Sequence, residues 1–124
     1  MEVKYLICKT CGKIVSVVKD SKVPAMCCGA KMEELIAGTT DASVEKHVPV
    51  YSVSGYRVLV NVGAVSHPMT EEHFIEWVTV VTTRGVHTKY LTPNTNPSVE
   101  FALTDNETVK EVYAYCNLHI LWKA

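Results

Sequence analysis

The sequence predicts a mainly β protein, in which a small metal-bound head precedes an immunoglobulin-like, seven-stranded antiparallel β-sandwich. Two observations predict the sandwich: β-branched and aromatic runs alternate with turn residues, and nothing repeats at helical spacing over three turns. A third predicts the head, since the cysteine-rich start has too few hydrophobic residues to bury a core. The chain has 124 residues, enough for one modest domain and a mini-domain that a metal must stabilise.

The head is expected at residues 1–36, a stretch that is rich in turn residues and lysines. A small, polar linker follows at 37–43 (Ala-Gly-Thr-Thr-Asp-Ala-Ser), so the sandwich domain is placed at 37–124. Its strands are separated by turn signals such as Ser54-Gly55, Arg84-Gly85 and the Pro/Asn loop 93–97. The predicted strands are residues 48–53, 56–62, 74–83, 86–91, 99–103, 109–115 and 120–123.

Composition limits the classes of function. With 48% apolar and 20% charged residues the chain is a globular protein, and its net charge of −1 provides no basic stripe for nucleic acid. No segment resembles a membrane span or a signal peptide, so we expect no membrane partner and a cytoplasmic location. Five cysteines in a reducing compartment point to metal ligation or redox chemistry before disulfides.

The first candidate site is formed by the four cysteines of the head. Cys8 and Cys11 form a C-x-x-C-G knuckle, and Cys27 and Cys28 are adjacent. Neighbouring cysteines rarely bond to each other, because the trans peptide between them strains the ring. Four thiolates favour a tetrahedral site for iron or zinc. The spacing does not distinguish the two metals, so a zinc site without redox function remains an alternative.

The second candidate site combines four histidines with a late cysteine. Its expected ligands are His47, His67, His73, Cys116 and His119, all at predicted strand ends. Such a set suits Fe(II) and leaves a sixth position for substrate. A blue-copper site is the competing interpretation, but its usual pattern does not use four histidines. His87 lies in a strand pattern without a ligand motif, and we expect it to titrate as an ordinary surface residue.

With both motifs in view, the sequence resembles the desulfoferrodoxins along essentially its whole length. The resemblance rests on C-x-x-C and C-C in a desulforedoxin-like head, then E-K-H-V-P, H-P-M with a following histidine, and C-N-x-H. It implies two irons per chain: a rubredoxin-like FeCys4 centre in the head and a catalytic FeHis4Cys centre in the sandwich. It also implies a homodimer and a rubredoxin-like electron donor.

The activity implied by this resemblance is superoxide reduction, in which superoxide is converted to hydrogen peroxide without oxygen production. In similar proteins the residue at Glu45 closes onto the ferric iron, and the residue at Lys46 presents a positive charge to the incoming anion. Taken alone, both would be residues of a solvated loop. Two other functions remain open from the sequence: a rubredoxin-like electron carrier and a zinc-stabilised binding domain.

Overall fold

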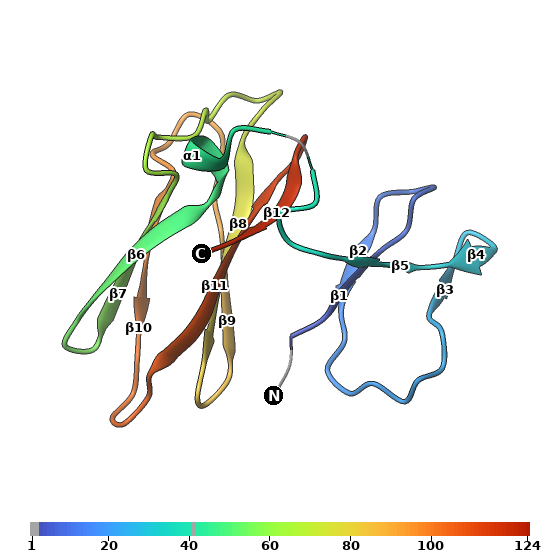
Figure 1. Ribbon diagram of the computed structural model, residues 1–124, viewed down its shortest axis with the longest axis horizontal. Coiled ribbons are helices and arrows are strands. Elements are labelled where there is room, and N and C mark those ends of the chain that lie inside the picture. The colour runs from blue at the N-terminus through green and yellow to red at the C-terminus, as the bar shows by residue number, and fades with distance from the viewer. Residues whose placement is uncertain (1–2, 41) are drawn as a thin grey trace. The chain divides into compact units, whose positions relative to one another are not determined.

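The computed structural model describes residues 3–40 and 42–124 (Figure 1). The chain divides into two compact units, the first ending at Ile36 and the second beginning at Ala37. Each unit is described by itself below. No helix in the described residues is long and apolar enough to cross a membrane.

The N-terminal unit is built from five short strands. Three form an antiparallel sheet in the order β2-β1-β5, and the other two form a hairpin. Their bounds are β1 Tyr5–Ile7, β2 Ile14–Ser16, β3 Met26–Cys27, β4 Ala30–Lys31 and β5 Glu33–Leu35. The buried apolar side chains here are those of Tyr5, Cys8 and Leu35. So small a core supports the expectation that this unit needs a metal to fold.

The β3–β4 hairpin explains the Cys-Cys-Gly sequence. Cys27 pairs with Ala30, which leaves Cys28 and Gly29 as a two-residue turn. Both turn residues have positive φ, 53° and 74°, as a type I′ turn requires. Gly29 adopts this conformation without cost, and Cys28 is held in it by the hairpin.

The C-terminal unit is an antiparallel sandwich of seven described strands, as the sequence predicted. One sheet has the order β10-β7-β6 and the other β12-β11-β8-β9. The strands are β6 Pro49–Ser54, β7 Arg57–Val62, β8 Ile75–Thr82, β9 Val86–Tyr90, β10 Ser98–Ala102, β11 Val109–Cys116 and β12 Ile120–Lys123. Most strand ends lie within one residue of the prediction. The exception to the all-strand expectation is a single helical turn, α1 (Val44–His47).

The core lies between the two sheets. Alternation along β7 turns Val58, Val60 and Val62 inward, each fully buried, while the residues between them are exposed. They pack with Val78 of β8 and Val112 of β11. The core therefore fixes the positions of the strand ends and of the loops between them.

The end of the sandwich where β8 meets β9 carries a buried carboxylate. Glu107 accepts hydrogen bonds from the Thr82 hydroxyl, from the backbone N–H of Thr104 at 2.8 Å and from Nε2 of His87 at 2.8 Å. His87 is thus paired with a buried acid, whereas the sequence predicted an ordinary surface histidine. The contacts join the β8–β9 hairpin to the loop before β11.

Candidate metal centres

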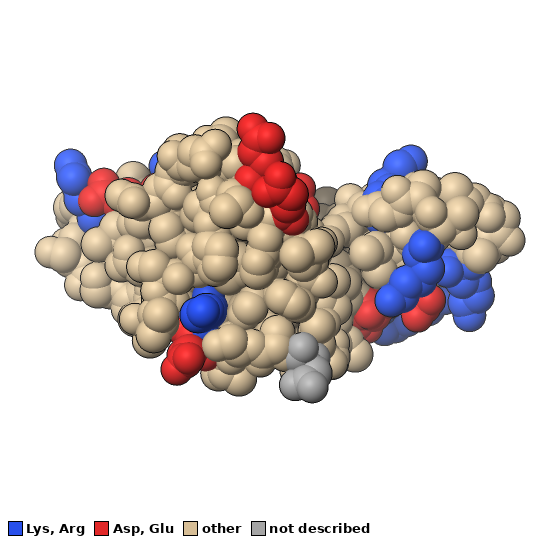
Figure 2. Space-filling model, turned by 90° about the horizontal axis from the view of Figure 1, so that it is seen from above, with Lys and Arg blue, Asp and Glu red and all other residues tan. Residues whose placement is uncertain are grey.

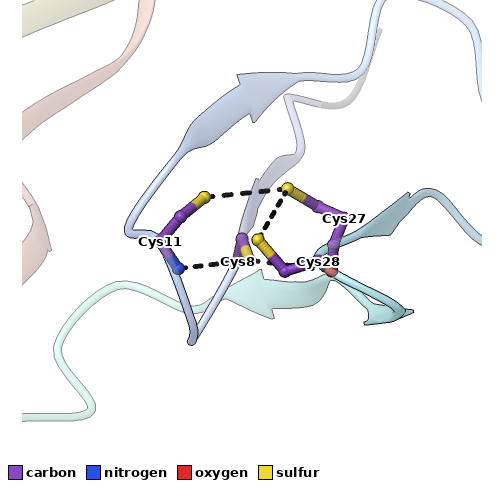
Figure 3. A group of neighbouring side chains, drawn as sticks. All are labelled: Cys8, Cys11, Cys27 and Cys28. Carbon is purple, nitrogen blue, oxygen red and sulfur yellow. Dashed lines mark hydrogen bonds between the residues drawn. The ribbon is translucent and has the colours of Figure 1, made fainter.

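The four cysteines of the N-terminal unit face one another (Figure 3). Their sulfur atoms lie within 4.8 Å of each other, with 3.7 Å between Cys11 and Cys27 and 4.0 Å between Cys27 and Cys28. Four sulfurs around one tetrahedral metal at about 2.3 Å lie about 3.8 Å apart. The spacing fits a single metal ion with four thiolates.

The surroundings of Cys8 favour the ionised form of its thiol. The backbone N–H of Cys11 contacts the Cys8 sulfur at 3.5 Å and lowers the pKa of Cys8 to about 6. Contact with Cys8 and Cys11 instead raises the pKa of Cys27 to about 12, because a neighbouring thiolate opposes a second negative charge. A bound cation would be needed to hold all four as thiolates at neutral pH.

The four predicted histidines form a ring at one end of the sandwich. Neighbouring rings have centroids 4.5 to 5.1 Å apart in the order His47, His67, His73, His119, and each pair is edge to face. The diagonal pair His47 and His73 is 6.2 Å apart and nearly parallel. Imidazoles packed edge to face in this way would offer several nitrogen ligands to one metal ion.

The ring nitrogens show which atoms face the centre. Nδ1 of His47 lies 2.6 Å from the carbonyl oxygen of Ser43, and Nδ1 of His67 lies 2.6 Å from that of Pro68. A carbonyl oxygen can only accept, so each Nδ1 carries the proton and each Nε2 presents a lone pair. Hydrogen bonds of this kind fix the tautomer and orientation of metal-ligating histidines.

Those lone pairs are directed at each other. Nε2 of His47 lies 3.0 Å from Nε2 of His67 and 3.0 Å from Nδ1 of His119. The Nε2 atoms of His47 and His67 are both acceptors, and at this distance they repel unless a cation lies between them. Nitrogens bound at about 2.1 Å and at right angles around one metal lie about 3.0 Å apart, which is the observed separation.

Burial favours the neutral form of His47, His67 and His73. It lowers the pKa of His67 to about 4 despite the Pro68 carbonyl, and it lowers the pKa values of His47 and His73 as well. Nε2 of His73 is buried and has no hydrogen-bond partner among the described residues. Neutral imidazoles with unsatisfied nitrogens are ready to bind a metal without first losing a proton.

Cys116 ends β11 and supplies the sulfur of the site. It is fully buried, and its Sγ lies 3.9 Å from Nδ1 of His119. Burial raises the pKa of its thiol, while the backbone N–H groups of Leu118 and His119 lower it. Those N–H groups can bond to a thiolate sulfur and stabilise its charge. The turn is strained at Ile120, a β-branched residue with φ of 55° directly after His119.

Glu45 and Lys46 lie in α1, immediately before His47. Glu45 is exposed and Lys46 is partly buried. The positive charge of Lys46 contributes to the lowered pKa values of His47 and His73, after burial as the main cause. The charge of Lys46 therefore acts electrostatically on two of the four clustered histidines.

The structure brings the nominated ligands into two groups, the four cysteines in one and His47, His67, His73 and Cys116 in the other. His119 lies beside the second group, with its Nδ1 3.0 Å from Nε2 of His47 and 3.9 Å from Sγ of Cys116. The other two nominated residues, Glu45 and Lys46, lie in α1 before His47.

Sequence reasoning gave no role to Asn117 and Trp122, which support the second group. Asn117 stands inside the C-N-x-H motif, and that position was the available signal. The indole N–H of Trp122 donates to the His119 carbonyl oxygen at 2.9 Å, and its ring packs against His47.

Charge does not mark an extended binding surface on the face shown in Figure 2. Basic and acidic side chains gather there in small separate groups with uncharged surface between them. Several are paired, as Lys4 is with Asp20 and Arg57 with Glu100.

The known proteins that this chain resembles belong to a family consistent with its two candidate metal sites. The desulfoferrodoxin family model matches residues 39–124. A desulfoferrodoxin homolog of Archaeoglobus fulgidus is 43% identical over 117 residues, 94% of this chain and 92% of its own. The desulfoferrodoxin of Clostridium acetobutylicum is 41% identical over 123 residues, 99% of this chain and 96% of its own.

A solved structure resembles the whole chain as well. The superoxide reductase from Treponema pallidum has a TM-score of 0.84 and 36% identity, and the match covers 100% of this chain and 99% of that one. The one-iron superoxide reductase from Giardia intestinalis, with a TM-score of 0.55 and 34% identity, matches 64% of this chain. With its two ligand groups, its fold and its relatives in agreement, the chain belongs to the desulfoferrodoxin family.

Proposed function

We propose that this protein is a superoxide reductase, which converts superoxide to hydrogen peroxide at an iron held by His47, His67, His73, His119 and Cys116. One observation carries the proposal: the Nε2 lone pairs of His47 and His67 face each other at 3.0 Å near a buried cysteine, an arrangement that needs a cation. The resemblance to superoxide reductases from other organisms supports the choice of reaction.

The reaction balances as superoxide plus one electron plus two protons giving hydrogen peroxide, with no oxygen released. Iron, when bound, supplies the one-electron chemistry. The Cys116 thiolate donates electron density toward it, as cysteine ligation does in haem oxygenases. The four imidazoles would complete a ligand set of intermediate character that suits Fe(II).

Two further side chains have proposed roles at the site. Lys46 attracts the superoxide anion, since its charge already influences His47 and His73. Glu45, one residue earlier in α1, is proposed to close onto the oxidised iron. Its exposed side chain is free to approach from solvent.

The head is proposed to bind a second iron through Cys8, Cys11, Cys27 and Cys28, with a rubredoxin-like protein as electron donor. The tetrahedral spacing of the sulfurs supports a metal there. A cytoplasmic location is proposed with it, because none of the five cysteines forms a disulfide and reduced cysteines are typical of that compartment.

A homodimer is proposed on the basis of β6, an edge strand of its sheet. Its residues Val50–Ser54 are exposed and include no charge, no proline and no bulge that would discourage pairing. Two copies of β6 related by a two-fold axis could join their sheets.

The function is tested by metal analysis combined with product measurement. The full chain, loaded with iron and reduced, is mixed with superoxide, and both peroxide and oxygen are measured. One peroxide per superoxide consumed and no oxygen is the expected result. Colourless protein containing zinc would indicate a stabilised binding domain, and half an oxygen per superoxide would indicate a dismutase.

A further inference from the structure

We propose that Asn117 is a positioning residue, which fixes His73 relative to the loop of Cys116 and His119. This inference rests on the proposed function only in that the histidine site holds iron, and it does not depend on the reaction with superoxide. It starts from the β8–β11 ladder, whose last pair is Cys116 with Ile75. Beyond that pair β11 turns away toward β12, so regular strand pairing cannot reach His73.

Asn117 extends the hydrogen bonding between the two segments beyond the last strand pair, with its side chain as well as its backbone. Its backbone N–H donates to the Phe74 carbonyl oxygen at 3.2 Å. Its side-chain Oδ1 accepts from the Phe74 N–H at 3.0 Å, and its Nδ2 donates to the Glu72 carbonyl oxygen at 3.0 Å. Three hydrogen bonds from one residue therefore hold the main chain on both sides of His73.

An asparagine suits this task because its planar amide offers one acceptor and two donors. The amide of Asn117 faces an N–H and a C=O, the same two groups that a neighbouring strand would bond. Aspartate lacks the donor, and alanine lacks both groups. The chemistry of the position thus requires an amide.

His73 depends on such a clamp more than its neighbours do. The ring Nδ1 atoms of His47 and His67 are each fixed by a carbonyl oxygen at 2.6 Å. The hydrogen bonds recorded for His73 within residues 42–124 reach its main chain, where Thr70 bonds its N–H and its carbonyl oxygen. Thr70 and Asn117 together hold the backbone from which the ring projects.

The clamp therefore ties three proposed ligands into one unit. Asn117 directly follows Cys116 and precedes His119 by two residues, and His73 lies within the segment that Asn117 holds. Loss of the amide would free the 72–74 segment to shift relative to the cysteine. Outer-shell partners of metal ligands are typically worth 10 to 100-fold in metal affinity or activity.

The test measures iron release from the reduced, iron-loaded full chain into a ferrous chelator. Two phases are expected, and the phase of the cysteine site serves as an internal reference, since all variants keep it. Asn117→Ala should accelerate release from the histidine site on the order of tenfold. It should also change the electron paramagnetic resonance spectrum of the oxidised histidine site, which reports ligand geometry.

Two companion variants sharpen the result. Asn117→Asp keeps the acceptor for the Phe74 N–H but loses the donor to Glu72, so its release rate should lie between the parent and Asn117→Ala. Asn61→Ala, which removes an exposed amide from β7, should match the parent in rate and spectrum.

The proposal is overturned if Asn117→Ala keeps the parent rate and spectrum. A lower melting temperature for that variant would not alter this conclusion, because a loss of stability with unchanged spectrum and release rate would show a purely structural role. Should Asn117→Ala fail to fold, parent behaviour of Asn117→Asp would overturn it instead. Superoxide turnover is not used in any of these comparisons.

Discussion

Gly63 and Lys46 approach each other main chain to main chain: a Cβ added to Gly63 would lie 2.6 Å from the carbonyl oxygen of Lys46. Gly63 has φ of 90° and donates its N–H to the Val48 carbonyl oxygen at 3.2 Å. The loop after β7 therefore lies directly against the helical turn that carries His47.

Gly63→Ala should both destabilise the sandwich and disturb the histidine site. A positive φ alone costs an alanine about 1 to 2 kcal/mol, and the clash with main chain adds to it. Gly55→Ala is the matched control, since Gly55 also has positive φ but open space around it. In denaturant unfolding, the decrease in the free energy of unfolding should be at least twice as large for Gly63→Ala as for Gly55→Ala. Equal decreases for the two variants would show that the close approach of the Gly63 and Lys46 main chains adds no destabilisation.

Glu107 should make the sandwich sensitive to acid. Hydrogen bonds from Thr82, Thr104 and His87 lower the pKa of Glu107 to about 2 from the ordinary 4.5. A lowered folded-state pKa stabilises the fold above pH 4.5, and this contribution is lost as the pH falls toward 2. Glu107→Gln should therefore be less stable than the parent at pH 7, with the difference shrinking through that range.

Unfolding free energies measured at several pH values check this expectation. Glu100→Gln is the control, because Glu100 is exposed on β10 and its substitution should cost less than about 0.5 kcal/mol at any pH. A Glu107→Gln difference that stays constant from pH 7 to 3 would contradict the assignment.

Cys11→Ser should remove iron from the head and leave the histidine site loaded. The reason is that the two ligand groups belong to separate compact units. Metal analysis should fall from two irons to one per chain, and superoxide reduction with a chemical reductant should persist. Loss of both irons, or of all activity, would mean that the sites are not independent.

Lys46→Ala should slow the reaction with superoxide about tenfold while the iron site stays assembled. A unit charge a few ångströms away, after solvent screening, contributes on the order of 1 to 2 kcal/mol, and about 1.4 kcal/mol is one decade in rate. Added salt should slow the parent more than the variant. Pulse radiolysis at several ionic strengths measures both effects.

Glu45→Ala is the control for Lys46→Ala, since it should alter the oxidised spectrum more than the encounter rate. If parent and Lys46→Ala react at the same rate with the same dependence on salt, Lys46 is an ordinary solvated lysine.

Val53→Lys should weaken the proposed dimer. Val53 lies on the edge strand β6 and is 52% exposed, and two-fold pairing of β6 would bring two such lysines close together. Sedimentation should show a dimer for the parent and monomers for the variant. A parent that sediments as a monomer would exclude the pairing, and a variant that remains dimeric would place the interface elsewhere.

Strand positions could be predicted from the sequence because they follow from alternation and turn residues. β7 is the clearest case, with Val58, Val60 and Val62 all inward. The grouping of the ligands could be predicted as well, since strand ends meet at the ends of a sandwich. These inferences use only short-range patterns and one rule of architecture.

Other features depend on contacts between distant segments and could not be predicted. Nothing near Glu107 in sequence indicates that Thr82 and His87 would surround it. Likewise, the spacing of the histidines does not say that His47 faces the centre through Nε2 and His119 through Nδ1. The rings of His47 and His67 are oriented by backbone carbonyls, whose positions only the folded chain supplies.

The β8–β11 pair is fastened differently at its two ends. One end leads into His73 and Cys116, and the other leads through Thr82 to the Glu107 cluster. At the first end the hydrogen bonds of Asn117 would be joined by the proposed metal, whereas at the second end hydrogen bonds alone hold the segments. Removal of iron from the proposed site should therefore allow the first end of the strand pair to open locally. Amide protons around Ile75 would then exchange with solvent early, while those near Thr82 would stay protected until the whole sandwich unfolds.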